Sequence, residues 1–184
     1  MQLPTRNKKG EVDGLDEAIC PYDFNWDPDK TITDKDFNAI FAVIPEGVNF
    51  VWISDSCHSG DLERSLTKSK SVKKTISLPI DIEWRLQTAK QKSVETAQIS
   101  KTADHLHLAF ISGCKSNQTS ADALFKKRYN GALTYFLLQE LNKSDGLSIK
   151  LTELVKRVNT TIKKGSFTQT PTLYGCKHLK HIPF

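Results

Sequence analysis

Apolar residues in the second half of the chain repeat with helical spacing. Leu133, Phe136, Leu137 and Leu141 fall on one stripe and predict a helix over residues 131–142. A longer stripe predicts a second helix over residues 152–164, ended by a glycine at position 165. Its apolar members are Leu151, Leu154, Val155, Val158 and Ile162. Both stripes are typical of helices that cover one side of a core.

One helix is also predicted in the first half. Thr33 or Asp34 is suited to cap its start, because a short polar side chain can accept a hydrogen bond from a free backbone N–H of the first turn. Pro45 ends it, since proline has no N–H to continue the helix. The apolar positions follow the helical period: Phe37, Ile40, Phe41 and Ile44.

Residues 48–54 are apolar at nearly every position, which predicts a strand buried on both faces. A second strong strand is predicted at 105–111, and shorter strands are predicted at 18–22 and 172–174. Strands that alternate with helices indicate an α/β fold. A length of 184 residues suits a single domain, 1–184. Between residues 61 and 104 the composition changes to Lys, Ser, Thr and Gln, so we expect a variable basic linker between segments 1–60 and 105–184.

Charge and cysteine content narrow the function classes. The net charge of +5 comes largely from short lysine and arginine clusters, which usually mark solvated loops and helix ends. Basic residues do not interleave with aromatic ones, so nucleic acid is an unlikely partner. No apolar run approaches the ~20 residues that span a bilayer, and the first twenty residues hold no secretion signal. The four cysteines are far apart, which favours reduced thiols and a cytoplasmic location.

The predicted strand at 48–54 runs into a polar turn with the sequence Asp55-Ser-Cys57-His-Ser-Gly60. The end of a buried strand is where an α/β fold places reactive groups, so Cys57 is a candidate nucleophile. Asp55 lies two residues earlier and projects to the same side in an extended segment. Gly60 lets the chain turn without a Cβ. The alternative is that Cys57 is an ordinary buried thiol.

This hexapeptide resembles the nucleophile motif of metacaspases, which are caspase-like cysteine peptidases. Residues 13–24, 32–34, 111–114, 118–122 and 131–134 resemble further segments of that family, in the same order. The resemblance implies a caspase-like three-layer sandwich with a mostly parallel central sheet. In the family a Ser-Gly-His-Gly segment, which carries the general base, lies just before the part that begins at Gln2. The expectation is therefore a domain truncated at its front, without its N-terminal strands and without this histidine.

The resemblance also implies an activity. We expect a cysteine endopeptidase that cleaves polypeptides after Arg or Lys through a thioester on Cys57, impaired in this chain because the base is absent. A carboxylate at Asp55 suits a pocket for the basic residue, although it could instead merely cap the turn. The alternative is a non-catalytic caspase-like module, which binds a chain supplying the missing front half.

Two further expectations follow from the same family. Many metacaspases are activated by calcium through acidic residues that match Asp16 and Asp34, and calcium takes several oxygen ligands from loops. Ordinary helix capping explains Asp34 nearly as well. Family members also process themselves between their two halves, so the lysine-rich segment 68–74 is a candidate substrate of the chain's own activity. A plain solvated loop is the alternative.

Overall fold

A computed structural model describes residues 2–4, 15–27, 30–56, 71–73, 79–80, 82–84, 107–115, 118–143 and 148–183. The chain divides into two compact units. One comprises Met1–Ile44, His58–Gly60 and Thr75–Gln98. The other comprises Pro45–Cys57, Asp61–Lys74 and Ile99–Phe184. The first unit holds one sheet and the second holds two.

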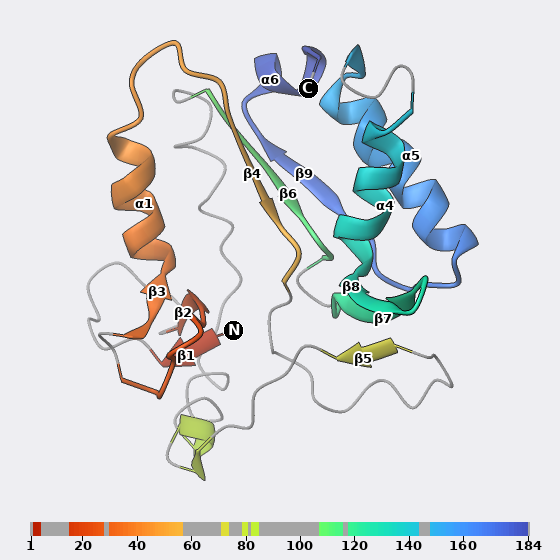
Figure 1. Ribbon diagram of the computed structural model, residues 1–184. Coiled ribbons are helices and arrows are strands. Elements are labelled where there is room, and N and C mark those ends of the chain that lie inside the picture. Colours follow the sequence, from red (N-terminus) through yellow and green to blue (C-terminus); the bar gives the residue numbers. More distant parts are fainter. Residues whose placement is uncertain are drawn as a thin grey trace. The chain divides into compact units, whose positions relative to one another are not determined.

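The first unit is a small antiparallel sheet followed by a helix. Its strands β1 (Gln2–Pro4), β2 (Leu15–Ile19) and β3 (Ile32–Thr33) pair in that order, and α1 (Asp34–Ala42) begins directly after β3 (Figure 1). The Thr33 hydroxyl accepts from the backbone N–H of Asp36, whose carboxylate accepts from the N–H of Thr33. These hydrogen bonds hold the pKa of Asp36 below its usual value. The cap predicted for α1 is thus confirmed.

The second unit is built on the strands β4 (Phe50–Ser54), β6 (Leu108–Ser112) and β9 (Thr172–Gly175). β6 lies between the other two, parallel to β4 and antiparallel to β9. Ser54 lies opposite Ser112, so β4 and β6 end at the same edge. The expected α/β architecture is confirmed, and the expected parallel pairing is that of β4 with β6.

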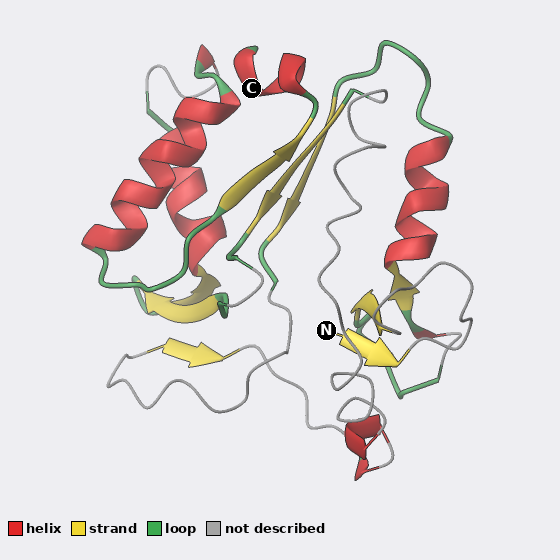
Figure 2. Cartoon of the chain, turned by 180° about the vertical axis from the view of Figure 1, so that it is seen from behind, coloured by secondary structure: helices red, strands yellow, loops and turns green. Residues whose placement is uncertain are grey.

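Two helices pack against one face of this sheet (Figures 1 and 2). They are α4 (Ala132–Leu141) and α5 (Leu151–Lys164), close to the predicted bounds. Ala109 and Ile111 of β6 point toward them, because alternate residues of a strand face the same side. The apolar stripes predicted for both helices are confirmed as the core: Leu133, Phe136, Leu137, Leu151, Leu154, Val155, Val158 and Ile162 are buried.

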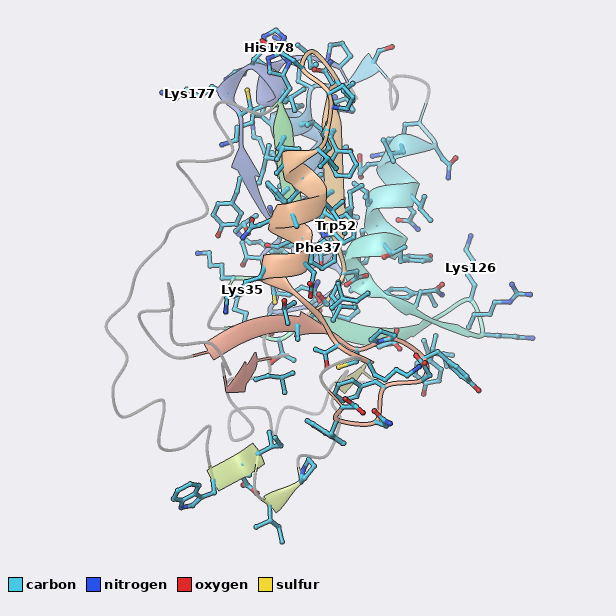
Figure 3. The ribbon with its side chains drawn as sticks, turned by 90° about the vertical axis from the view of Figure 1, so that its left-hand side faces the viewer. Lys35, Phe37, Trp52, Lys126, Lys177 and His178 are labelled. Atoms are coloured by element: carbon cyan, nitrogen blue, oxygen red, sulfur yellow. The ribbon has the colours of Figure 1, made fainter. Side chains whose placement is uncertain are left out.

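A second sheet in this unit was not predicted. β7 (Ala121–Phe125) and β8 (Arg128–Gly131) form a hairpin, and β5 (Ser71–Lys73) pairs with the other edge of β7. β5 falls within the segment predicted as a linker, most of which lies outside the described residues. The hairpin turn is made by Lys126 and Lys127, both at positive φ (+45° and +69°). Lys126 extends away from the hairpin (Figure 3).

The described chain ends in a short helix, α6 (Lys177–His181), directly after β9. Gly175 joins the two at a φ of +104°, and a Cβ there would lie 2.3 Å from the carbonyl oxygen of Leu108. Only glycine fits this close approach. Leu179 of α6 is buried against the core. Within the described residues, no helix is long and apolar enough to cross a membrane.

One carboxylate is buried between the two core helices. Glu140 of α4 is 3% exposed and accepts hydrogen bonds from Lys143 and from the Thr161 hydroxyl of α5. Burial raises the pKa of Glu140, but these hydrogen bonds and the charges of Lys143 and Arg157 outweigh burial. The pKa therefore lies below its usual value, so ionised Glu140 stabilises the folded state.

The depressed pKa predicts a pH-dependent stability. Ionised Glu140 contributes fully above the pKa of an unfolded glutamate, about 4.3, and the contribution disappears as pH falls through the lower folded value. Glu140→Gln should therefore lower the free energy of unfolding by about 1–2 kcal/mol at pH 7 and by progressively less below pH 4. Urea denaturation at pH 7, 5 and 3.5 measures this difference. Glu153→Gln, which removes ion pairs of a partly exposed carboxylate, is the matched control. A constant cost of Glu140→Gln across this range would contradict the prediction.

Candidate active site

The candidate site lies at the shared end of β4 and β6. The backbone N–H of Gly113 donates to the carbonyl of Ser54 at 2.8 Å, which extends the pairing of the two strands by one residue. Asp55 follows β4 at this point, and a Cβ on Gly113 would lie 3.3 Å from Asp55 Oδ1. The carboxyl ends of neighbouring parallel strands are where α/β proteins place their sites.

Three hydrogen bonds hold the half-buried carboxylate of Asp55. The hydroxyl of Ser120 donates to Oδ1 at 2.7 Å. Thr134 donates to Oδ2 twice, from its backbone N–H at 2.9 Å and from its hydroxyl at 2.7 Å. These donors lie 65 and 79 residues further along the chain. Both oxygens of the carboxylate are thereby fixed in position.

Asp55 also completes the start of α4. Gly131, the residue before that helix, has no side chain to cap it, and the first turn holds no acidic residue. Thr134 is the third residue of α4, so its N–H has no carbonyl partner within the helix. Asp55 supplies the missing acceptor and places a negative charge at the positive end of the helix dipole. Asp55 therefore caps a distant helix.

A buried layer of neutral polar side chains supports this arrangement. Ser120 is fully buried, and Gln169 is 2% exposed. Gln169 donates to the carbonyl of Gly113 at 2.9 Å and to the Ser120 hydroxyl at 3.4 Å, and it accepts from the N–H of Ala121 at 2.8 Å. Burying polar groups is tolerated when they are hydrogen-bonded, as here. The layer fixes where the Ser120 hydroxyl points.

Cys57 lies outside the described residues, as do His58, Ser59 and Gly60. The motif is described as far as Ser56, whose hydroxyl is 2.6 Å from that of Ser54. Cys57 is two residues after Asp55 in the sequence.

The other cysteines lack the features of a nucleophile. Cys114 and Cys176 are buried, and the Cys114 thiol donates to the carbonyl of Gln118. Burial raises the pKa of the Cys20 thiol, which lowers its thiolate fraction. Nucleophilic chemistry requires an accessible thiolate. Cys57 therefore stays the candidate nucleophile.

The described histidines lie at the other end of the sheet. His107 precedes β6, accepts the Phe50 N–H at its carbonyl, and has its ring 5.7 Å from that of His178. Five strand residues separate His107 from Gly113, which is about 16 Å or more along the strand. His107 and His178 are therefore too far from Asp55 to act at this site.

The two acidic residues expected to bind calcium lie in the first unit. Asp16 is in β2, and Asp34 is the first residue of α1. Thr33 pairs with Ala18, so the antiparallel register brings the backbone of Asp34 alongside that of residues 16–17. Among the side chains that the structure describes, no group of three or more His, Cys, Asp or Glu residues could hold a metal ion.

The residues around Asp55 carry no local sequence signal of their role. Gly113, Ser120 and Thr134 all fall in segments that resemble the metacaspases, but nothing in their local sequence connects them with Asp55. Gln169 belongs to no segment that was singled out. Only long-range pairing reveals these contacts.

Comparison with known proteins agrees with this geometry. The sequence profile of the caspase domain, a peptidase family, matches residues 4–182. The chain belongs to the caspase-domain family. Metacaspase-9 of Arabidopsis thaliana is 28% identical over 86% of this chain and 62% of its own length. Metacaspase-1 of the same plant is 32% identical over 86% of this chain and 40% of its own length.

A solved structure shows the same fold. The crystal structure of a protein from Geobacter sulfurreducens aligns with 95% of this caspase-domain chain and 62% of its own chain, with a TM-score of 0.59 and 24% identity. The resemblance found in the motifs is thus confirmed at the level of the family. Since this chain spans between two fifths and two thirds of these metacaspases, their complete activity is a proposal for it.

The close packing at Gly113 generates a stability prediction. A Cβ there would meet the Ser120 hydroxyl at 2.8 Å, so Gly113→Ala must displace that hydroxyl and should cost about 1–3 kcal/mol. Removing the hydroxyl with Ser120→Ala makes room, since the remaining Ser120 Cβ is at 3.4 Å. The double variant should therefore cost at least about 0.5 kcal/mol less than the sum of the single variants. Urea denaturation of all four proteins measures this, and strictly additive costs would refute the clash.

Proposed function

We propose that this chain is a cysteine endopeptidase that cleaves after Arg or Lys. The observation that supports this most is the carboxylate of Asp55, held by three hydrogen bonds two residues before Cys57. Membership in a peptidase family supports hydrolysis of polypeptides in general. The finer specificity is our inference from Asp55.

In the proposed reaction, the Cys57 thiolate attacks the carbonyl carbon of the scissile peptide bond. The C–N bond breaks, the amine leaves with a proton, and the acyl group stays on sulfur as a thioester. Water then attacks the thioester, which releases the carboxylic acid product and returns the thiol. No oxidant or cofactor is consumed.

The basic specificity follows from the environment of Asp55. Ser120 and Thr134 bond this carboxylate as neutral donors, so they orient its negative charge without cancelling it. A cation that arrives with the substrate interacts more strongly with a half-buried carboxylate than with an exposed one, because the ion pair is partly shielded from water. The guanidinium of arginine and the ammonium of lysine are such cations.

The thiol also needs a base, because a free cysteine is only slightly ionised near neutral pH. The family resemblance implies that this base is the histidine of a Ser-Gly-His-Gly segment. The 184-residue sequence contains no such segment. Loss of a general base typically lowers a rate by about 10²–10⁴-fold. We therefore propose that these residues on their own turn over slowly.

The chain is also a candidate substrate of its own activity. β5 ends at Lys73, whose backbone lies opposite Ala121, and Ala121 directly follows Ser120. The pairing of β5 with β7 thus supports a lysine of segment 68–74 as a cleavage point near Asp55. In this proposal the lysine-rich segment supplies the basic residue.

A non-catalytic binding module is the second candidate. Among the described strands, β4 pairs only with β6, which leaves its other edge as a place where another strand could add. A chain that supplies such a strand would be the partner. Peptide binding without any turnover, even with an added partner, would favour this candidate.

A peptide assay tests the proposed peptidase. Fluorogenic peptides that differ only in ending in Arg, Lys or Asp should be cleaved after Arg and Lys only. Cys57→Ala should abolish cleavage, and Asp55→Asn should lower kcat/KM for both basic peptides by about 10-fold or more, because the half-buried negative charge that pairs with the basic side chain is lost. Intact-mass measurement of the same reactions reports self-cleavage within 68–74.

Two controls make the assay decisive. Asp23→Asn removes an exposed carboxylate that pairs with Lys30 in the first unit, and it should leave cleavage unchanged. An Arg-ended chloromethyl ketone should label Cys57 even where turnover is slow, and mass spectrometry locates the label. Cleavage that survives Cys57→Ala, or a preference for Asp, would rule out the proposal.

We also propose calcium as a ligand of the first unit, held by Asp16 and Asp34. The β2–β3 register, which brings the backbone of Asp34 to that of Glu17, next to Asp16, supports this pair. Calcium prefers six to eight oxygen ligands, so further oxygens must come from backbone carbonyls or water. Bound calcium would supply positive charge that ties β2 to the start of α1.

The calcium proposal predicts a ligand-induced stabilisation. Millimolar CaCl₂ should raise the melting temperature of the chain, because a ligand that binds only the folded state stabilises it. Asp16→Asn and Asp34→Asn should each remove most of this shift, whereas Asp23→Asn should keep it. Differential scanning calorimetry with CaCl₂ and with MgCl₂ makes the measurement. An equal shift in all variants would contradict the assignment.

A further inference from the structure

We propose that His107 and His178 form a two-histidine binding site for a divalent transition-metal ion. His107 directly precedes β6, and His178 lies in α6 near the end of the chain (Figure 3). The centroids of the two rings are 5.7 Å apart, and the rings are tilted by 44° to each other. This site lies at the end of the sheet away from Asp55, and it does not depend on the proposed peptidase function.

The separation of the two rings suits a shared metal ion. A zinc–nitrogen bond is about 2.0–2.1 Å long, which places the centre of each ring roughly 3.2 Å from the metal. Two rings on one ion then have centres roughly 4.5–5.8 Å apart, for angles at the metal between about 90° and 130°. The observed 5.7 Å lies at the upper end of this range. His178 is exposed, so its ring can turn toward an ion without displacing packed atoms.

Asn49 fixes which nitrogen of His107 can bind a metal. Nδ1 of His107 lies 3.3 Å from the side-chain oxygen of Asn49. An amide oxygen can only accept a hydrogen bond, so Nδ1 carries the proton and donates it. In the neutral ring Nε2 then keeps its lone pair, which is the group that binds a metal. Histidine ligands usually donate their other N–H to an oxygen in this way.

Backbone contacts hold the two histidines near each other before any metal arrives. The N–H of Cys176 donates to the carbonyl of Leu108 at 2.8 Å. This bond joins the residue after His107 to the start of α6. Leu179, the neighbour of His178, is buried against the core, so α6 is fixed on the sheet. A site whose ligands are already positioned binds with a smaller loss of conformational entropy.

The donor atoms and the nearby charges select the class of metal. Imidazole nitrogen suits zinc, nickel and copper, whereas calcium and magnesium prefer oxygen. Lys177 and Lys180 of the same helix are positively charged, which disfavours cations held by charge alone. Within the described part of the chain, no set of three or more His, Cys, Asp or Glu side chains could hold a metal. Water therefore completes the coordination, and the ion exchanges with solvent.

Isothermal titration calorimetry of the full chain with NiCl₂ tests this site. His107→Gln and His178→Gln should each weaken the Kd for nickel by about tenfold or more, because only one imidazole of the pair remains. The double variant should bind within about twofold of either single variant, since two ligands of one ion act as a unit. Additive losses would show that the histidines bind nickel independently and would overturn the inference.

His181→Gln is the matched control, because this exposed histidine lies in the same helix, and it should keep the parent Kd within about twofold. Asn49→Leu should weaken binding by about tenfold, since Nδ1 of His107 loses its acceptor. Millimolar NiCl₂ should also raise the melting temperature of the parent but not that of His178→Gln, a change at an exposed position that leaves the fold intact. A shift that survives His178→Gln, or a parent chain that binds no nickel, would overturn the inference.

Discussion

The second unit depends on how one carboxylate is satisfied. Asp55 follows β4, yet the donors Ser120 and Thr134 come from the segment before β7 and from the first turn of α4. A half-buried charge costs free energy unless it is hydrogen-bonded, and an open helix start needs an acceptor. One group meets both requirements. The position of α4 and the orientation of the acid are therefore set together.

The layer behind Asp55 shows why neutral donors suit this place. Ser120 and Gln169 fix the acid by hydrogen bonds, and a lysine or arginine in their place would neutralise it. Neither of these two side chains carries a charge of its own. Elsewhere in the same unit Glu140 is bonded directly by Lys143, which is a purely structural solution. This contrast distinguishes Asp55, at the candidate site, from Glu140, which supports the packing of the core helices.

Much of this fold is readable from the sequence, because it is encoded locally. The capping box of α1 and the apolar stripes of α4 and α5 are repeats within single segments. The β7–β8 hairpin was missed because its turn is Lys126-Lys127, where residues that favour positive φ, such as Asn-Gly, would be the usual signal. The partners of Asp55 could not be predicted at all, since no local pattern links residues 65 and 79 positions apart. The sequence has Asp55 two residues before the candidate nucleophile, but it holds no sign of the hydrogen bonds that Asp55 makes.

The long sequence separation of these bonds has a consequence for an interrupted chain. β4 and Asp55 precede the segment 61–104, whereas β6, Ser120 and Thr134 follow it. A backbone break within this segment leaves the pairing of β4 with β6 and the hydrogen bonds from Ser120 and Thr134 to Asp55 intact. The two fragments would then hold together as a non-covalent complex, with the acid from one fragment seated on the helix of the other.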